Sequence, residues 1–326
     1  MTESEWIALA ERRVSRILQQ RRYASIRQLE KKISEAGPPE MRPEPVKVSR
    51  AVARLVRAGH VISEAAAGLP TFYMPSNFGL ETDAERRAEI LDLTKKFHAL
   101  TQNRTLCGNA FESVVKGAAL QSGRYRVISP AKQWMEIDGY ALEKESDHIL
   151  HPKTFVGPSF VVEDKNLREW LTPSSEEVWA LIGKALRIPG AVPVLICRRM
   201  HYVGYGVFKG MGLLCWQVYR QYFDPAVENQ LGPMRHKDGL GFSDLTTNLE
   251  PPAALIRFFE KTLPAHGDLF KARFEAVRAL LEKYAIEYGM ENDDLVVSKR
   301  SELYEQFRQE LFPPKEPEGG YGFEDF

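Results

Sequence analysis

The N-terminal part of the chain carries apolar residues at the spacing of two successive helices. From Glu5 to Gln20 they fall every three or four residues, which is the period of an α-helix with one buried face. Ser25 can cap a second helix in which Leu29 and Ile33 point inward, and Gly37 followed by two prolines ends it. The pattern therefore predicts two helices ahead of the first proline-rich turn.

A third helix carries arginines on one side. It opens at Ser49 with the segment RAVARLVRAGHVI, whose apolar residues share one face. The opposite face gathers Arg50, Arg54 and Arg57. A glycine ends this helix, and HVISE and TFYMP follow as the two short strands of a hairpin. Residues 1–78 are therefore predicted to form three helices followed by a hairpin.

Residues 107–225 alternate between helical and strand patterns. A helix is predicted in GNAFESVVKGAAL, strands in RYRVIS, WMEIDGYAL and SFVVEDKNL, a second helix in SSEEVWALIGKAL, and a fully buried strand in AVPVLICRR. The segments HYVGYGVFKGMG and LLCWQVYRQYF follow as a closing helix and strand. This order predicts an α/β domain, a mixed sheet flanked by helices.

The flanking segments are predicted to be helical or flexible. Residues 79–106 are a charged helical connector, and residues 226–311 are mainly helical after a loop rich in Gly, Asp and Asn. An apolar stripe from Phe270 to Tyr288 in this helical region fits an internal core or a dimer interface. Residues 312–326 form an acidic tail, rich in proline and glycine, that is expected to be flexible.

Composition narrows the class of protein without naming a function. The chain has 326 residues, is 44% hydrophobic and 27% charged, and has a formal net charge of zero, as an ordinary folded protein of two or three domains does. Its 3 cysteines have no C-x-x-C spacing, which argues against a disulfide framework or a cysteine zinc site. No apolar run is long enough for a membrane span and no signal peptide is evident, so we expect a cytoplasmic protein without membrane contact.

The residues that carry chemistry lie on the predicted helix and strands of the α/β domain. Glu112 lies beside the apolar stripe of the helix, Asp138 is the acid of the WMEIDGYAL strand, and the SFVVEDKNL strand ends in Glu163 and Lys165. Strand alternation puts Glu163 and Lys165 on one face and Asp164 on the other. Asp138 and Glu163 would offer the oxygen ligands that Mg²⁺ prefers, with Glu112 joining through a metal-bound water. Lys165 would hold the attacking water while the metal stabilises charge on a phosphate.

These residues, in this order of elements, resemble the PD-(D/E)xK (restriction-endonuclease-like) nuclease superfamily. The resemblance covers about 115 residues and is greatest to the Mrr and archaeal Holliday-junction resolvase branches. It implies a DNA endonuclease dependent on Mg²⁺ or Mn²⁺, with Glu112, Asp138, Glu163 and Lys165 as catalytic residues and the three acids as metal ligands. A restriction, phage-defence or repair context is implied as well.

Three features depart from the pattern of that superfamily. Ile137 stands where the family has proline, and the 25-residue step from Asp138 to Glu163 makes a long hairpin with an inserted loop. The helix after Glu163 and Lys165 carries no glutamine, so Glu176, Glu177 or Lys184 would replace it. These departures concern the subfamily more than the fold.

The N-terminal pattern of three helices and a hairpin resembles a winged helix-turn-helix domain. In that family the third helix enters the major groove of DNA, which implies DNA contacts for Arg50, Arg54 and Arg57, with Lys47 nearby. Residues 1–75 hold 13 Lys and Arg against 8 Asp and Glu, a balance suited to a polyanionic partner. A domain of this kind also docks proteins, and that alternative stays open.

Two rival interpretations belong to other functional classes. The chain is either a winged-helix regulator that binds DNA or protein, with an inert second domain, or a non-catalytic subunit of a larger defence complex. A homodimer or a partner subunit is accordingly among the expected partners. Asp147, His148 and His151 form a separate candidate metal trio. The alternative is that both histidines are ordinary solvated residues of a loop.

Overall fold

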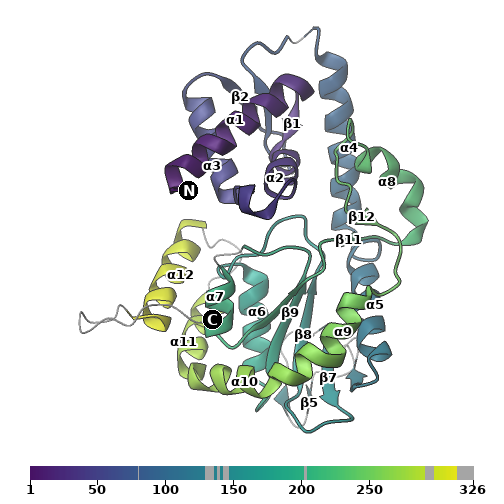
Figure 1. The fold of residues 1–326 in the computed structure, drawn as a ribbon, viewed down its shortest axis with the longest axis vertical. Coiled ribbons are helices and arrows are strands. Elements are labelled where there is room, and N and C mark those ends of the chain that lie inside the picture. Colours follow the sequence, from purple (N-terminus) through teal and green to yellow (C-terminus); the bar gives the residue numbers. More distant parts are fainter. Residues whose placement is uncertain are drawn as a thin grey trace.

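The structure is a computed structural model in which an N-terminal helical unit lies against an α/β core, with the long helix α4 running beside both (Figure 1). It describes residues 1–79, 81–128, 136–137, 140–141, 147–201, 204–290 and 297–313. Within these ranges no helix is both long and apolar enough to cross a membrane.

The N-terminal unit consists of the three predicted helices and the hairpin. Its helices are α1 (Glu3–Arg21), α2 (Ile26–Ser34) and α3 (Pro45–Arg57), and its strands β1 (Ala24–Ser25), β3 (Phe72–Pro75) and β2 (Val61–Glu64) pair in that order as an antiparallel sheet. Ser25 caps α2 as predicted, because its hydroxyl accepts the backbone N–H of Gln28. Helix α3 begins at Pro45 rather than at Ser49, because proline fits the first turn of a helix.

A mixed five-stranded sheet forms the centre of the core. Its strand order is β10-β9-β8-β7-β4, comprising β4 (Tyr125–Ile128), β7 (His148–Pro152), β8 (Phe160–Lys165), β9 (Val192–Cys197) and β10 (Leu214–Gln217). Strand β7 is antiparallel to both β4 and β8, whereas β8, β9 and β10 run parallel to one another. The carboxyl ends of the three parallel strands therefore meet at one edge of the sheet.

Helices cover both faces of this sheet. One face packs against α6 (Glu176–Leu186), α7 (Gly204–Gly210), α11 (Arg278–Met290) and α12 (Val297–Leu311). The other packs against α5 (Gly108–Gln121), α9 (Ala253–Arg257) and the π-helical turn η4 (Phe258–Thr262). Strand β8 is buried on both faces, which is why Phe160, Val161 and Val162 form a continuous apolar run.

The C-terminal segments continue this core. Helix α10 (Leu263–Ala276) contacts β9 and brings Gly267 against the Phe160 ring at the amino end of β8. The stripe predicted from Phe270 to Tyr288 lies on α10 and α11, where Phe274, Leu281 and Tyr284 are buried in the core of one sheet face. The stripe is thus an internal core, one of the two alternatives left open by the sequence.

Besides the long helix α4 (Ala84–Gln102), the elements not yet named are short. They are η1 (Pro39–Met41), β5 (Glu136–Ile137), β6 (Tyr140–Ala141), β11 (Gln221–Tyr222), η3 (Pro225–Val227), α8 (Glu228–Arg235) and β12 (Leu245–Thr246). An apolar cluster joins α4 to the segment from η3 to β12 and to the N-terminal hairpin. Phe97, Phe242 and Phe72 are among its buried rings. The hairpin is also held to α4 by Glu64, which accepts hydrogen bonds from Tyr23 at 3.0 Å and Arg87 at 2.9 Å.

Buried charges fasten α2 to the carboxyl edge of the sheet. Glu35, directly after α2, accepts hydrogen bonds from both Arg198 after β9 and Trp170. Arg198 and Arg168 also pair with Asp244, at 3.1 and 2.9 Å. Buried ion pairs keep their charges only when hydrogen bonds surround them, so this network fixes the N-terminal unit against the core.

Candidate active site at the carboxyl edge of the sheet

Strand β8 delivers an acid and a lysine to one face of the sheet, as its alternation predicts. Glu163 Oε1 accepts a hydrogen bond from Lys165 Nζ at 2.7 Å, and its Oε2 accepts one from Lys184 Nζ of α6 at 2.6 Å. Glu163 is buried, whereas the Lys165 side chain remains 23% exposed. Lys184 is therefore the residue of α6 that contacts Glu163, one of three named for that helix from the sequence.

Asp147 brings a second carboxylate to the same place. It directly precedes β7, and its Oδ2 accepts the backbone N–H of Asp164 at 2.7 Å. Burial, together with the negative charges of Glu163 and Glu112, raises the pKa of Asp147 to about 6, against the lowering effects of the Asp164 N–H and of Lys165. A carboxyl group perturbed by neighbouring acids at a strand end is a candidate functional group.

The position of Asp147 corrects the strand order predicted from the sequence. The strand that pairs with β8 on this side is β7, whereas among the described residues Glu136–Ile137 pairs with Tyr140–Ala141 in a separate two-stranded sheet. The long hairpin predicted between the WMEIDGYAL and SFVVEDKNL strands is therefore wrong. Asp138 itself lies outside the described residues.

A sequence signal for Asp147 does exist. His148, Ile149 and Leu150 after it are all buried, and Ile and Leu in such a short run are what a central strand contributes. The run is only three residues long. The alternation around Asp138 is more regular, so the sequence favours that segment as the strand next to β8. From the sequence, Asp147 is a candidate only as part of the metal trio with His148 and His151.

Glu112 lies within electrostatic reach of these carboxylates. It belongs to α5, its side chain is 20% exposed, and its nearest cation is Arg104 at 3.5 Å. Its charge contributes to the raised pKa of both Asp147 and Asp164. Of the four catalytic residues predicted from the sequence, Glu112, Glu163 and Lys165 thus lie around Asp147.

A buried histidine–aspartate pair supports the site from the opposite face of β8. His148 Nε2 and Asp164 Oδ2 are 2.7 Å apart, and both side chains are almost fully enclosed. Burial raises the pKa of Asp164 to about 7. Burial opposes the charge on His148, but the attraction and hydrogen bond of Asp164 raise the pKa of that imidazole. The pair holds in place the Asp164 peptide whose N–H binds Asp147.

The trio of Asp147, His148 and His151 does not assemble into a metal site. Alternation along β7 puts His148 and His151 on opposite faces, and His151 Nδ1 is hydrogen-bonded to Ser159 Oγ at 2.8 Å. Across the described parts of the chain, no group of three or more His, Cys, Asp or Glu side chains is placed to hold a metal ion.

The carboxylates of the site nevertheless fit a magnesium-type ion. Mg²⁺ binds through one or two carboxylates, retains several waters and takes further oxygens from substrate phosphates. Asp147 and Glu163 are such oxygen donors. The pKa of Asp147 is raised first by burial and then by the charges of Glu163 and Glu112, and a cation would offset those charges. Each Glu163 oxygen accepts one lysine bond, and a carboxylate oxygen has room for a second partner.

The predicted DNA-contacting residues of α3 are largely paired with acids of α1. Lys47 lies 3.0 Å from Glu3, which also binds Arg50, and Arg54 lies 3.7 Å from Glu11. Arg57 is exposed. Paired surface cations still attract a polyanion, but with a smaller net charge than the sequence alone suggests.

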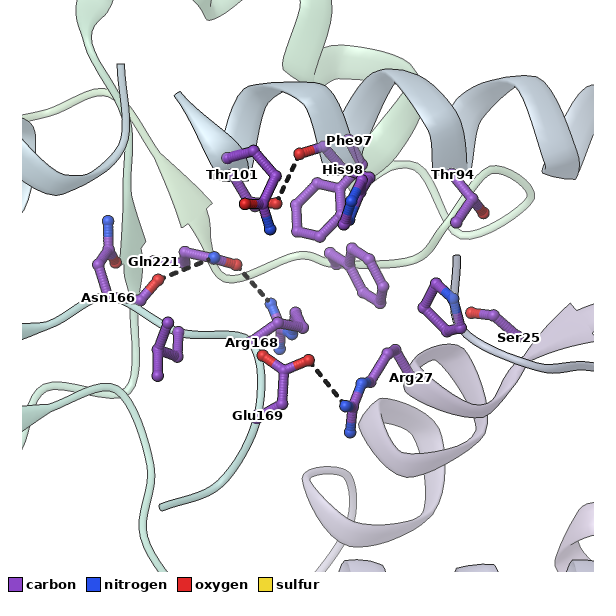
Figure 2. A pocket seen from close by; sticks show the side chains of 14 residues that line it. Ser25, Arg27, Thr94, Phe97, His98, Thr101, Asn166, Arg168, Glu169 and Gln221 are labelled. Carbon is purple, nitrogen blue, oxygen red and sulfur yellow. Dashed lines mark hydrogen bonds and ion pairs between the residues drawn. The ribbon is translucent and has the colours of Figure 1, made fainter. Parts of the chain in front are cut away.

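A separate cavity of about 130 Å³ lies between the N-terminal unit, α4 and the segment after β8 (Figure 2). Its two arginines are paired with other side chains of the protein. Arg27 pairs with Glu169 at 2.7 Å, and Arg168 donates to Gln221 at 3.3 Å. The cavity therefore presents no unpaired charge to a phosphate, which sets it apart from the strand-end site.

Comparisons with known proteins identify no relative from which a function could be transferred. No protein-family model, curated protein or solved structure matches this chain.

Proposed function

We propose that this chain is a metal-dependent DNA endonuclease whose active site is formed by Asp147, Glu163, Lys165 and Glu112. The observation that carries the proposal is the meeting of Asp147 with Glu163 and Lys165 at one sheet edge, on elements distant in sequence. Two carboxylates beside a lysine suit phosphodiester hydrolysis, since the acids hold a divalent cation and the lysine offers a fixed positive charge.

Each side chain has a distinct role in this proposal. Lys165 is protonated at neutral pH, because the charge and hydrogen bond of Glu163 raise its pKa against the effect of burial. It therefore orients the attacking water or the phosphate by donating hydrogen bonds, and it does not act as the base. Asp147 Oδ2 is occupied by the Asp164 N–H, so Oδ1 is the oxygen that we assign to the metal.

The metal and the supporting lysine complete the arrangement. Mg²⁺ or Mn²⁺, bound by Asp147 and Glu163, would stabilise the charge that develops on the phosphate. Glu112 would bind a water of the ion. Lys184 holds Glu163 Oε2 at 2.6 Å, which fixes the rotamer of that carboxylate and lets Lys165 act from the other oxygen.

The test is cleavage of supercoiled and linear DNA in Mg²⁺, Mn²⁺ or EDTA. We expect cleavage that needs the metal and is lost in Lys165→Ala and in Asp147→Asn. Asp138→Asn is the matched control, which retains activity if Asp147 is the metal ligand. Cleavage that survives both Lys165→Ala and Asp147→Asn would refute the site. A chain that binds DNA without cleaving it under any condition would instead favour a regulator or a non-catalytic subunit.

A further inference from the structure

An exposed tyrosine lies at the same sheet edge as the candidate active site. Tyr219 follows the edge strand β10, and 52% of its surface is exposed. Its backbone has φ of 60°, a left-handed conformation that residues other than glycine seldom adopt. Such conformations persist where the surrounding structure enforces them, and they gather at functional sites.

The Tyr219 ring is one end of a series of cation–π and edge-on ring contacts, called the stack below. The Arg199 guanidinium lies 4.4 Å from its centroid and 5.6 Å from that of Trp170. The Trp170 ring in turn meets His201, with centroids 5.6 Å apart. The stack continues into the buried network, because Trp170 Nε1 donates to Glu35 at 3.1 Å. These contacts hold the tyrosine ring in one orientation.

The stack is close to the catalytic lysine. The Arg198 N–H donates to the Lys165 carbonyl at 3.3 Å, and the Tyr219 N–H donates to the Arg198 carbonyl at 3.2 Å. Lys165 and Tyr219 are thus separated by one intervening strand, or about 10 Å. That span equals roughly three stacked base steps of a nucleic-acid strand.

We propose that Tyr219 is a stacking platform for an unpaired base of a single-stranded DNA segment next to the cleaved phosphate. One face of its ring is covered by Arg199, and within the described chain no second ring or cation covers the other. Within a continuous duplex both faces of a base are stacked on neighbouring bases, so a protein ring stacks on a base where that stack is interrupted, as in an unpaired segment. The exposed Arg220 adds positive charge for the backbone.

This inference names a substrate class and rests on the proposed nuclease function. It favours DNA with single-stranded segments, such as flaps, gaps or unpaired branches, over continuous duplex. The contact with Arg199 holds the ring in place before DNA arrives, which lowers the ordering cost of binding.

The test compares the whole chain with Tyr219→Gly and Tyr219→Phe by fluorescence anisotropy in EDTA. The probes are a labelled thymidine oligonucleotide and a duplex of equal length. We expect Tyr219→Gly to bind the single strand on the order of tenfold more weakly, with little change for the duplex, and Tyr219→Phe to bind like the original chain. Phe312→Ala, which removes an aromatic residue that is 49% exposed, is the matched control.

Glycine suits this test because it adopts a positive φ without strain. A loss of binding in Tyr219→Gly with an unchanged melting temperature therefore cannot be ascribed to misfolding. Equal weakening for single strand and duplex, no weakening, or an equal loss in Tyr219→Phe would overturn the platform. Absence of any DNA binding by the original chain would overturn the nuclease proposal itself, which separates the two failures.

Discussion

The Glu35 carboxylate is the centre of the charges that join α2 to the core, and its removal makes a quantitative prediction. Arg198 Nη1 lies 2.7 Å from Glu35 Oε1, and Lys31 Nζ lies 2.8 Å from Oε2. Burial alone would raise the pKa of Glu35, but the charges of Arg198, Arg168 and Lys31 lower it to about 2. Arg198 stays protonated at neutral pH, although burial lowers its own pKa to about 10.

The size of the effect follows from the lowered pKa. A fall from 4.5 to about 2 corresponds to about 3 kcal/mol of stability at neutral pH. Because the folded protein binds the Glu35 proton less tightly than the unfolded chain, this stability is fully present above about pH 4.5. It is lost as the pH falls toward 2 and is about 1.4 kcal/mol at pH 3. Glu35→Gln removes the charge at nearly constant volume and leaves Arg198, which is 1% exposed, with Asp244 as its remaining acid among the residues described.

Urea unfolding of the original chain and of Glu35→Gln at pH 7 and pH 3 measures the prediction. We expect the variant to be less stable by about 3 kcal/mol at pH 7 and by less than half of that at pH 3. Glu89→Gln removes an exposed acid that pairs with Arg86 at 2.7 Å and is expected to leave the unfolding midpoint unchanged. A loss below about 1 kcal/mol at pH 7, or a loss independent of pH, would show that the network does not hold the two parts together.

Three further predictions concern the candidate site, the thiols and helix α3. The pKa of Asp147 is raised from 3.8 to about 6, so the contribution of this residue to stability in EDTA falls as the pH rises through that window. Asp147→Asn is therefore expected to be more stable than the original chain at pH 8, by up to about 3 kcal/mol in urea unfolding. A less stable variant would contradict the crowding of acids. All 3 cysteines are buried, so Ellman's reagent is expected to label none in the folded chain and all of them in denaturant, and fast labelling of the native chain would disprove their enclosure. Glu3→Gln frees Lys47 and Arg50 and is expected to tighten DNA binding at low salt, an effect that vanishes at high salt if electrostatics cause it.

Much of the secondary structure can be predicted from the sequence because each element carries its own local signal. Each of these signals spans only a few neighbouring residues. Examples are the Ser25 cap, the continuous apolar run of β8 and the apolar periodicity of α6. The alternation of Glu163 and Lys165 against Asp164 follows from strand geometry alone, and the contacts of the three side chains agree with it. Local rules suffice wherever the determinant lies inside one element.

Pairing between strands is a different kind of information. Which strand adjoins β8 depends on contacts between residues that are far apart in the chain, and periodicity does not encode those contacts. The segment around Asp138 alternates well, yet β7, with its short buried run, occupies the neighbouring place. Asp147 reaches the site through that pairing and through one backbone N–H. The network around Glu35 is equally non-local, since it joins α2 to residues that follow β8 and β9.

The ends of β8 and β9 serve two purposes at once, and this links the N-terminal unit to the proposed chemistry. Lys165 ends β8, and Arg168 of the buried network follows within a few residues. Arg198 and Arg199 directly follow β9, the first binding Glu35 and the second supporting Tyr219. A displacement of α2 would therefore shift the peptide segments that carry the stacking ring and adjoin the lysine. On this argument the N-terminal unit acts on cleavage by holding the strand ends in register, in addition to any contact that α3 makes with DNA.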